Sequence, residues 1–265
     1  MSKELEYFKS KTDMIRRDII TMLGEAGSGH PGGSLSAVEI LSSLYYELME
    51  EGDKFVLSKG HSAPALYSIL ADKGYFAKKE LMTLRKLGSI LQGHPDMKKT
   101  PGVHFSTGSL GQGLSAANGM AIAAKYDKSD QRIYVLLGDG ELQEGQIWEA
   151  VMTARHRRLD NLITYVDHNN LQIDGSCVEV KSLDKIKEKF LSFGWGVFTI
   201  DGHDIKSIIE TTRKAWQVKW KPVCIICNTI KGKGISFMED EVGWHGKAPS
   251  KEEVELALKE LKGVE

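Results

Sequence analysis

Two oxygen-bearing side chains stand out by their positions in the sequence. Asp139 lies between two glycines at the end of an apolar run, and Asn169 ends another apolar run thirty positions later. A carboxylate and an amide oxygen form a hard, all-oxygen ligand set, which suits Mg²⁺ or Ca²⁺ and suits soft metals poorly. Mg²⁺ takes few protein ligands and completes its shell with phosphate oxygens and water. The pair therefore predicts a cation that bridges these residues to a phosphate-bearing ligand, whose approach Gly138 and Gly140 would allow.

The elements that must position these residues alternate regularly from Gly113 onward. Apolar segments of strand length predict strands at 132–137, 161–167, 195–200 and 222–230. Amphipathic or small-residue segments predict helices at 114–126, 145–159, 183–194, 204–220 and 251–261. Strands that are apolar throughout and alternate with helices indicate a parallel sheet covered on both faces. We therefore predict a three-layer α/β/α fold with a mainly parallel sheet, as one domain spanning residues 1–265.

The first hundred residues are less regular. Helical periodicity predicts helices at 3–24, 36–49 and 79–87, and a short strand, a polar turn and a helix within 55–70. A long loop is predicted over 88–111. Ser34 or Ser36 is the predicted cap of the second helix, because serine side chains accept hydrogen bonds from free helix N–H groups.

Every predicted strand ends in polar or glycine-rich sequence. These five ends are Lys59-Gly60-His61, Gly138-Asp139-Gly140, Asp167-His168-Asn169-Asn170, Asp201-Gly202-His203-Asp204 and Lys231-Gly232-Lys233-Gly234. In an open parallel sheet the ligand crevice lies outside the carboxyl ends of the strands. One such end could be an ordinary turn, but five at one edge of the sheet predict a site.

Composition and charge exclude several classes of function. Lys plus Arg total 35 and Asp plus Glu total 36, so the net charge of -1 supplies no broad field for nucleic acid or an anionic membrane. No run approaches the ~20 apolar residues of a membrane span, and the first residues lack an apolar signal core. The three cysteines are too few for a disulfide framework, which favours a reducing cytoplasm. Cys224 and Cys227 form a C-x-x-C in an apolar run, and we predict core packing for them because no second pair completes a zinc site.

Nine motifs, in the same order along the chain, resemble those of transketolase, a thiamine diphosphate enzyme. They are SGHPGGSLS, LSKGHSAPALY, QGHPD, STGSLGQG, GDGELQEGQIWEA, DHNNLQIDG, IDGHD, TIKGKG and WHGKAP. The resemblance extends from about Gly24 to Pro249. It implies the thiamine diphosphate-binding fold, and thiamine diphosphate with Mg²⁺ or Ca²⁺ as cofactors.

The resemblance also implies how the cofactor would be held. Asp139, Asn169 and the backbone carbonyl of Leu171 would ligate the metal. Gly140 would let the backbone approach the diphosphate, to which Asn169 would also lie close. The segment containing Asn169 reads D-H-N-N, where the family carries an acid before the asparagine, but no ligand is lost by that difference.

Four histidines in the matched motifs would serve the substrate and the cofactor. By the resemblance, His61 and His245 would bind the diphosphate or lie beside the reacting centre. His30 and His94 would contact hydroxyls of the donor sugar and assist proton transfer. Which histidine performs which transfer stays open.

Two further motifs imply contacts with the rest of the cofactor and with another subunit. Gly108 and Leu110 would lie against the aminopyrimidine, with Leu110 supporting the bent cofactor. Ser109, which we place in the same cofactor site, stands where full-length transketolases generally carry proline. Glu144 would be a carboxylate at the subunit interface, in the network that links paired sites. Lys231 is as consistent with a solvated loop charge as with a catalytic one.

The transketolase pyrimidine-binding and C-terminal domains have no counterpart in residues 1–265. The resemblance therefore implies a split enzyme, in which this chain is the N-terminal subunit of an α₂β₂ assembly and requires a C-terminal subunit for activity. The expected reaction transfers a two-carbon ketol unit from a ketose phosphate such as xylulose 5-phosphate to an aldose phosphate. The residues that grip the sugar's phosphate are expected on the partner chain.

Three other functions remain open at this point. The alpha subunit of a 2-oxoacid dehydrogenase also carries only a diphosphate domain, but the four histidine motifs suit a polyhydroxylated sugar better. Deoxyxylulose phosphate synthase is a weaker candidate, because it is normally one longer chain. A non-catalytic subunit that keeps only the cofactor fold would be expected to lose its metal ligands first, and Asp139 and Asn169 are both present.

Overall fold

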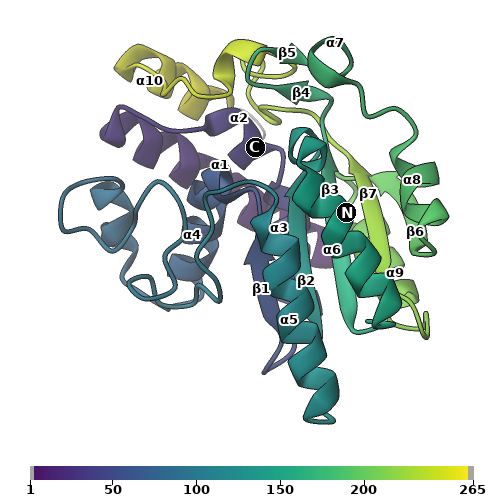
Figure 1. The fold of residues 1–265 in the computed structure, drawn as a ribbon. Helices are drawn as coiled ribbons and strands as arrows, with labels where there is room; N and C mark the ends of the chain where they lie inside the picture. Colours follow the sequence, from purple (N-terminus) through teal and green to yellow (C-terminus); the bar gives the residue numbers. More distant parts are fainter. Residues whose placement is uncertain (1–2, 262–265) are drawn as a thin grey trace.

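A five-stranded parallel sheet forms the centre of the molecule (Figure 1). The computed structural model describes residues 3–261. In spatial order the strands are β1 (Lys54–Leu57), β2 (Ile133–Gly138), β3 (Leu162–His168), β7 (Val223–Asn228) and β6 (Gly196–Asp201). Every neighbouring pair is parallel, so all five carboxyl ends meet at one edge, as the sequence predicts.

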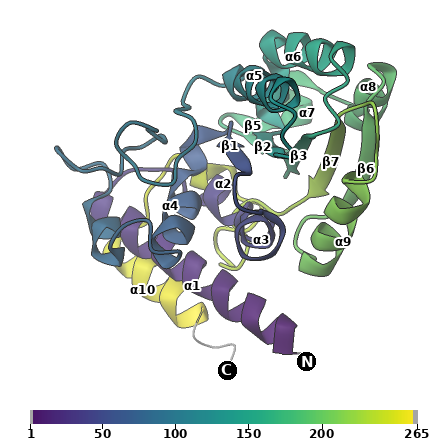
Figure 2. The same ribbon diagram turned by 90° about the horizontal axis from the view of Figure 1, so that it is seen from below.

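Helices cover both faces of this sheet, which confirms the predicted three-layer α/β/α fold (Figure 2). One face packs against α5 (Gln112–Tyr126), α6 (Gly145–His156) and α8 (Ile186–Ser192). The other face packs against α1 (Lys3–Ala26), α3 (Val38–Ser43), α4 (Ala63–Asp72) and α9 (Ile205–Ala215). The helix α10 (Lys251–Glu260) lies outside this layer, against α1.

Alternate residues of each strand enter two separate hydrophobic cores, because successive side chains of a strand point to opposite faces. On β2, Tyr134 belongs to the core under α1 and Val135 to the core under α5. On β7, Cys224 enters the α5 side and Cys227 the α1 side, and both are free and buried. The two thiols therefore cannot ligate one metal, and the predicted core packing of this pair is confirmed.

The helix predicted over 36–49 is present over 38–48, but its predicted serine cap is wrong. The chain forms α2 (Pro31–Leu35), then α3, then a π-helical turn over Leu44–Leu48. Helix formation starts earlier because proline is favoured in a first turn, where its missing N–H costs nothing. Ser34 Oγ donates to the His30 carbonyl (2.7 Å) and Ser36 Oγ donates to the Asp167 carboxylate (2.6 Å), so neither serine caps a helix.

Other helix boundaries differ from those that the periodicity of the sequence predicts. The helix predicted at 79–87 is a short 3₁₀ segment, Lys78–Thr83, followed by Arg85 in a left-handed conformation with φ of 62°. The helix predicted at 183–194 is only Ile186–Ser192, because Lys185 before it is also left-handed. The helix predicted at 204–220 ends at Ala215. A left-handed residue cannot continue a right-handed helix, and periodicity does not reveal it.

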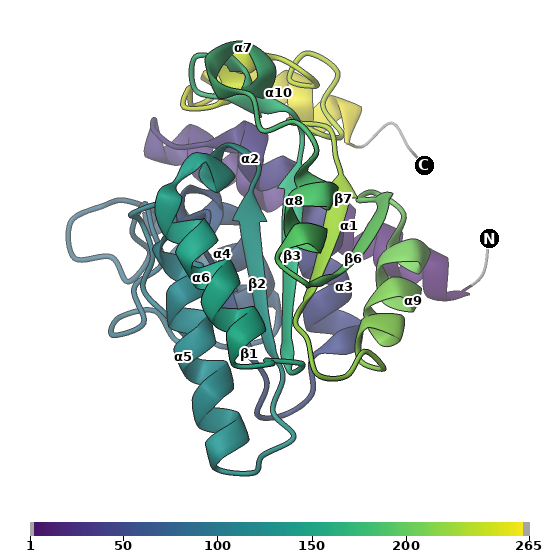
Figure 3. The same ribbon diagram turned by 45° about the vertical axis from the view of Figure 1, so that its right-hand side comes forward.

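The segment that connects β3 to α8 lies above the carboxyl ends of the strands (Figure 3). It consists of the two-residue strands β4 (Leu171–Gln172) and β5 (Gly175–Ser176), paired antiparallel, and the helix α7 (Cys177–Lys181). Figure 3 shows α7 on the side of the sheet where the strands end. Within residues 3–261, no helix has the length and apolar character required to cross a membrane.

Candidate active site

A cleft of about 340 Å³ opens at the carboxyl edge of the sheet. The structure brings eleven of the twelve predicted site residues into its lining. They are His30, His61, His94, Gly108, Leu110, Asp139, Gly140, Glu144, Asn169, Leu171 and His245. The exception is Ser109, which is exposed and does not line the cleft, although both of its neighbours do.

Asp139 stands at one end of this cleft with its carboxylate fixed by the backbone. Its Oδ1 accepts from Gly140 N (2.7 Å) and its Oδ2 from Asn170 N (2.5 Å). The side chain is only 4% exposed, and burial together with the charge of Asp167 raises the pKa of Asp139. A bound cation would relieve the cost of keeping this carboxylate charged.

The other two predicted metal donors lie in the same wall. Asn169 is buried, and its Oδ1 accepts from Leu171 N (3.2 Å). The Leu171 carbonyl accepts from Lys231 Nζ (3.1 Å). Among the described residues no cluster of three or more His, Cys, Asp or Glu side chains could hold a metal. A carboxylate, an amide and a carbonyl instead offer the sparse oxygen set of a Mg²⁺ site that shares its ion with phosphate.

Glu141, to which the sequence assigned no role, ties three segments of the cleft together. Its Oε1 accepts from Gly111 N (2.9 Å) and from the Ser58 hydroxyl, and its Oε2 accepts from Gly138 N (3.0 Å). Burial raises the pKa of this carboxyl group despite these bonds. The end of β1, the Gly138–Gly140 loop and the loop before α5 are therefore held in register by one side chain.

A buried ion pair lies at the floor of the cleft, which Lys59 helps to line. Lys59 Nζ contacts the Asp167 carboxylate and also donates to the Gly33 carbonyl (2.9 Å). Burial alone would raise the pKa of Asp167, but Lys59 and the hydroxyls of Ser36 and Thr229 lower it. This network joins α2 to the ends of β1, β3 and β7, and so fixes the position of the histidine-bearing loops.

Three of the predicted histidines form a triangle inside the cleft. The ring centroids of His30 and His61 are 5.3 Å apart, those of His30 and His245 5.6 Å, and those of His61 and His245 5.4 Å. Burial, reinforced by nearby cations, lowers the pKa of His30 to about 4 and of His245 to about 3, and that of His61 well below its ordinary value. All three rings are therefore neutral at pH 7, and each can donate one hydrogen bond and accept another.

Lys231, which the sequence left undecided, lies in the cleft and is only 2% exposed. Its Nζ donates to the Leu171 carbonyl and lies 2.8 Å from His245 Nδ1. Burial and the neighbouring charge of Lys59 lower the pKa of Lys231 to about 8. The ammonium thus connects the predicted metal end of the cleft to the histidine triangle.

Two buried polar atoms of this region have no partner in the described part of the chain. They are His30 Nδ1 and Gln172 Nε2. A β-carbon at Gly140 would lie 3.2 Å from the Gln172 side chain, so a larger residue would crowd the loop that faces the cleft. Unsatisfied buried polar groups beside the oxygen atoms predicted to ligate a metal fit a polar, phosphate-bearing ligand such as thiamine diphosphate with a divalent cation.

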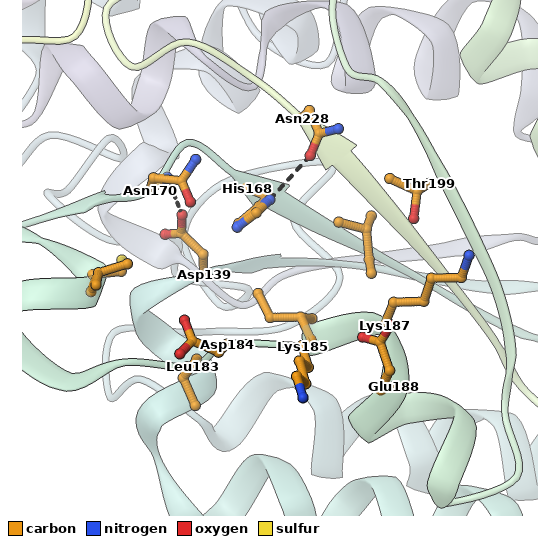
Figure 4. Close-up of a pocket in the computed structure, with 14 residues that line it drawn as sticks. Asp139, His168, Asn170, Leu183, Asp184, Lys185, Lys187, Glu188, Thr199 and Asn228 are labelled. Carbon is orange, nitrogen blue, oxygen red and sulfur yellow. Dashed lines mark hydrogen bonds between the residues drawn. The ribbon is translucent and has the colours of Figure 1, made fainter.

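A second cavity, of about 300 Å³, lies on the other side of Asp139, between α8 and the ends of β6 and β7 (Figure 4). His168 Nδ1 and Asn228 Oδ1 are 3.1 Å apart in its wall, and Asn170 separates it from the first cleft. None of its lining side chains has a buried nitrogen or oxygen that lacks a partner. We therefore assign no ligand to it.

The parallel sheet, with the oxygen donors and histidines at its carboxyl edge, is typical of α/β domains that bind a phosphate-bearing cofactor. Comparison with known families identifies the member of this class. Residues 9–265 match the family described as transketolase, thiamine diphosphate binding domain. The chain belongs to this family, which confirms the resemblance found in the sequence and the predicted class of enzyme subunit.

Relatives that match along their whole length are named as subunits. The chain is 44% identical to the 6-deoxy-6-sulfo-D-fructose transketolase subunit of Clostridium sp. (strain MSTE9), over 98% of each chain. It is 40% identical to one of the apulose-4-phosphate transketolase subunits of Phocaeicola vulgatus, over 97% of this chain and 95% of that one.

Larger transketolases match over part of their length. Human transketolase is 40% identical over 98% of this chain, but only 42% of the human protein is covered. The solved structure of transketolase from Campylobacter jejuni superposes with a TM-score of 0.92 at 34% identity, covering 99% of this chain and 43% of that chain. The chain thus spans about two fifths of these longer relatives.

Proposed function

We propose that this chain is the N-terminal subunit of a split transketolase. It binds thiamine diphosphate through Mg²⁺ and, with a partner chain that carries the pyrimidine-binding domain, transfers a two-carbon ketol unit from a ketose to an aldose phosphate. The observation that carries this proposal is the shared cleft. Its lining holds Asp139, Asn169 and the Leu171 carbonyl together with three neutral histidines.

The metal end of the cleft would bind the diphosphate. Asp139, Asn169 and the Leu171 carbonyl would hold Mg²⁺, whose remaining positions suit phosphate oxygens. Lys231 adds a positive charge beside the same carbonyl, and Gly140 lines the cleft there. When bound, thiamine diphosphate supplies an electron sink for the transferred unit, and the protein supplies position and electrostatics.

The histidines would orient the sugar. The Lys231 ammonium can only donate, so Nδ1 of neutral His245 accepts and its proton is on Nε2. Neutral His30 has an unpartnered Nδ1. Such rings can hydrogen-bond the carbonyl oxygen and hydroxyls of a ketose and move protons between them at neutral pH. A 2-oxoacid offers no comparable row of hydroxyl groups.

The partner and the sugar class are inferred from the relatives. Two matching chains of similar length are named as transketolase subunits, which supports a separately encoded partner chain. Because oligomers commonly have closed two-fold symmetry, we expect the two chains to form an α₂β₂ assembly. Glu144 is an exposed carboxylate at the start of α6 and would face that partner. The relatives' substrates are a sulfonated ketose and a phosphorylated sugar, so the donor is a ketose with an anionic far end, of which xylulose 5-phosphate is one example.

Reconstitution tests this proposal. The purified chain is mixed with the partner chain, thiamine diphosphate and Mg²⁺, and donors are compared in one assay: xylulose 5-phosphate, 6-deoxy-6-sulfofructose and pyruvate. We expect ketol transfer from a ketose, none from pyruvate, and none from either chain alone. Full turnover without the partner would refute the split site, and turnover of pyruvate alone would favour the 2-oxoacid alternative.

A further inference from the structure

His203 belongs to the IDGHD motif, to which the proposed function gives no role. It follows strand β6 and is not among the residues that line the cleft. Its Nε2 accepts from the Ile230 N–H (2.8 Å), and its Nδ1 lies 2.9 Å from Glu39 Oε2. A backbone N–H can only donate, so the ring proton is on Nδ1 and is donated to the Glu39 carboxylate. The ring therefore links a buried acid to the backbone of the segment that follows β7.

Glu39, on α3, also accepts from an arginine on α1. Arg16 Nη2 donates to Glu39 Oε1 (2.6 Å), and Arg16 Nε donates to the Lys233 carbonyl (3.0 Å). Burial alone would raise the pKa of Glu39, but Arg16 and His203 lower it. The carboxylate is therefore charged at pH 7, although the residue is only 6% exposed. We call Arg16, Glu39 and His203 the Glu39 cluster.

Gly234 of the TIKGKG motif leaves space for the arginine of this cluster. Its φ of 95° is left-handed, and a β-carbon there would lie 2.6 Å from Arg16 Nε. A side chain at this position would push the guanidinium away from the Lys233 carbonyl. The last glycine of the motif therefore serves the Glu39 cluster, outside the cleft.

The Glu39 cluster holds the backbone on both sides of Lys231. One bond goes to the N–H of Ile230, directly before it, and the other to the carbonyl of Lys233, two positions after it. Between them, the Gly232 N–H donates to the Gly32 carbonyl (3.0 Å). The backbone from which the Lys231 side chain extends is thus fixed by partners that are distant in the sequence.

The side chain of Lys231 runs from this backbone into the cleft. Its Nζ donates to the Leu171 carbonyl (3.1 Å) and lies 2.8 Å from His245 Nδ1. The residue is only 2% exposed, so water cannot replace a lost partner easily. A shift of the backbone at Ile230 would therefore move the ammonium away from both acceptors.

We propose that the Glu39 cluster positions Lys231 in the cofactor site, and that the bond from the Ile230 N–H to His203 transmits this effect. The inference rests on the proposed function, in which Lys231 lies beside the diphosphate. No member of the cluster lines the cleft, so its members act through the backbone and touch neither cofactor nor substrate.

A double-mutant cycle on the enzyme assembled with its partner chain tests this proposal. Fluorescence titration with Mg²⁺ present gives the thiamine diphosphate affinity of the unaltered enzyme, His203→Asn, Lys231→Met and the double variant. Asparagine can still donate to Glu39 from the position of Nδ1, but it offers no acceptor to the Ile230 N–H. We expect His203→Asn to weaken binding about fivefold alone and less than about 1.5-fold in the Lys231→Met background, because the lost bond acts only through Lys231. An equal loss in both backgrounds, or no loss in either, would overturn the proposal.

Matched variants separate positioning from general destabilisation. His203→Gln keeps an acceptor at the position of Nε2 and should bind the cofactor within about twofold of the unaltered enzyme. His156→Asn makes the same chemical change at an exposed histidine of α6 and should leave the affinity unchanged. If His203→Asn does not fold, Arg16→Lys replaces it in the cycle, since lysine lacks the Nε that binds the Lys233 carbonyl. The loss must again vanish in the Lys231→Met background, and a loss that persists there would overturn the proposal.

Amine labelling reports the position of Lys231 without the cofactor. The full chain is treated with acetic anhydride, and acetylation of Lys231 is followed by mass spectrometry, with the exposed Lys86 as internal reference. Lys231 should be protected in the unaltered chain and in His203→Gln, and should react at least about fivefold faster in His203→Asn, because the backbone that holds it opens more often. Equal rates in all three chains would overturn the proposal. If the rates differ as expected but the unaltered assembly binds no thiamine diphosphate, the proposed function is refuted and the positioning of Lys231 is upheld.

Discussion

Replacement of Glu141 by alanine should destabilise the chain without removing any proposed ligand. The carboxylate is 3% exposed and accepts from Gly111 N, Gly138 N and the Ser58 hydroxyl. Alanine would leave the two backbone N–H groups buried without an acceptor, at about 1–3 kcal/mol each. Relief from burying a carboxylate, whose pKa burial raises, offsets part of this cost. We expect a net loss of about 2–4 kcal/mol, which for a chain of this size lowers Tm by roughly 5–15 °C.

Two matched variants sharpen this experiment. Glu141→Gln keeps the oxygen that accepts from Gly111 and Ser58 and turns its amide toward Gly138, so it should lose about half as much stability. Glu144→Ala removes a nearby exposed acid and should stay within about 0.5 kcal/mol of the unaltered chain. Thermal and urea unfolding, followed by circular dichroism, measure all three. The structural role assigned to Glu141 is refuted if Glu141→Ala has the same Tm as the unaltered chain, or if Glu144→Ala loses as much stability as Glu141→Ala.

Three further outcomes are expected. Because the fold lowers the pKa of His30 to about 4 from an ordinary 6.5, its contribution to stability is complete above pH 6.5 and is lost as the pH falls toward 4; His30→Gln should therefore make the fall of Tm between pH 7 and pH 5 shallower. Lys231→Met should weaken thiamine diphosphate binding by the assembled enzyme about tenfold or more, by fluorescence titration, and unchanged affinity would exclude Lys231 from the cofactor site. Cys224 and Cys227, whose thiol pKa values are raised by burial, should react with an aromatic disulfide reagent only when the chain unfolds; rapid labelling of either of these two thiols in the native chain, located by peptide mapping, would contradict their core positions.

The sheet and the edge that bears the site could be predicted from the sequence because the pattern there is local. Continuous apolar runs such as 132–137 cannot face water on either side, so they imply a buried parallel strand. Once the strands are parallel, their polar ends must meet, and Asp139 and Asn169 come together without further information. The structure places them in one wall of the cleft, and their binding of a metal remains a proposal.

The residues that periodicity and motif did not reveal depend on tertiary packing. Lys231 and Lys59 are charged residues beside glycines, and such lysines are usually solvated, yet both are buried. Their burial follows from partners distant in the sequence, namely the Leu171 carbonyl for Lys231 and Asp167 for Lys59. Only the presence of each lysine inside a matched motif could have suggested a role.

The predictions of helix boundaries and caps failed for a different reason. The predicted cap at Ser34 or Ser36 followed propensity, but Ser36 binds Asp167, a residue far away in the sequence. The 3₁₀ segment before Arg85 and the helix after Lys185 are bounded by left-handed residues that are neither glycine nor asparagine. No local rule predicts such a conformation, because the surrounding structure imposes it.

Metal-dependent binding of thiamine diphosphate tests most directly whether the cleft is half of a ketol-transfer site. Calorimetry on the enzyme assembled with its partner chain compares the unaltered chain with Asp139→Asn, which keeps the volume of the side chain but removes its charge. We expect saturable binding that requires Mg²⁺ and disappears with a chelator, and a loss of at least tenfold in affinity for Asp139→Asn. Binding of equal affinity without Mg²⁺, or an affinity that Asp139→Asn leaves unchanged, would contradict the proposed site.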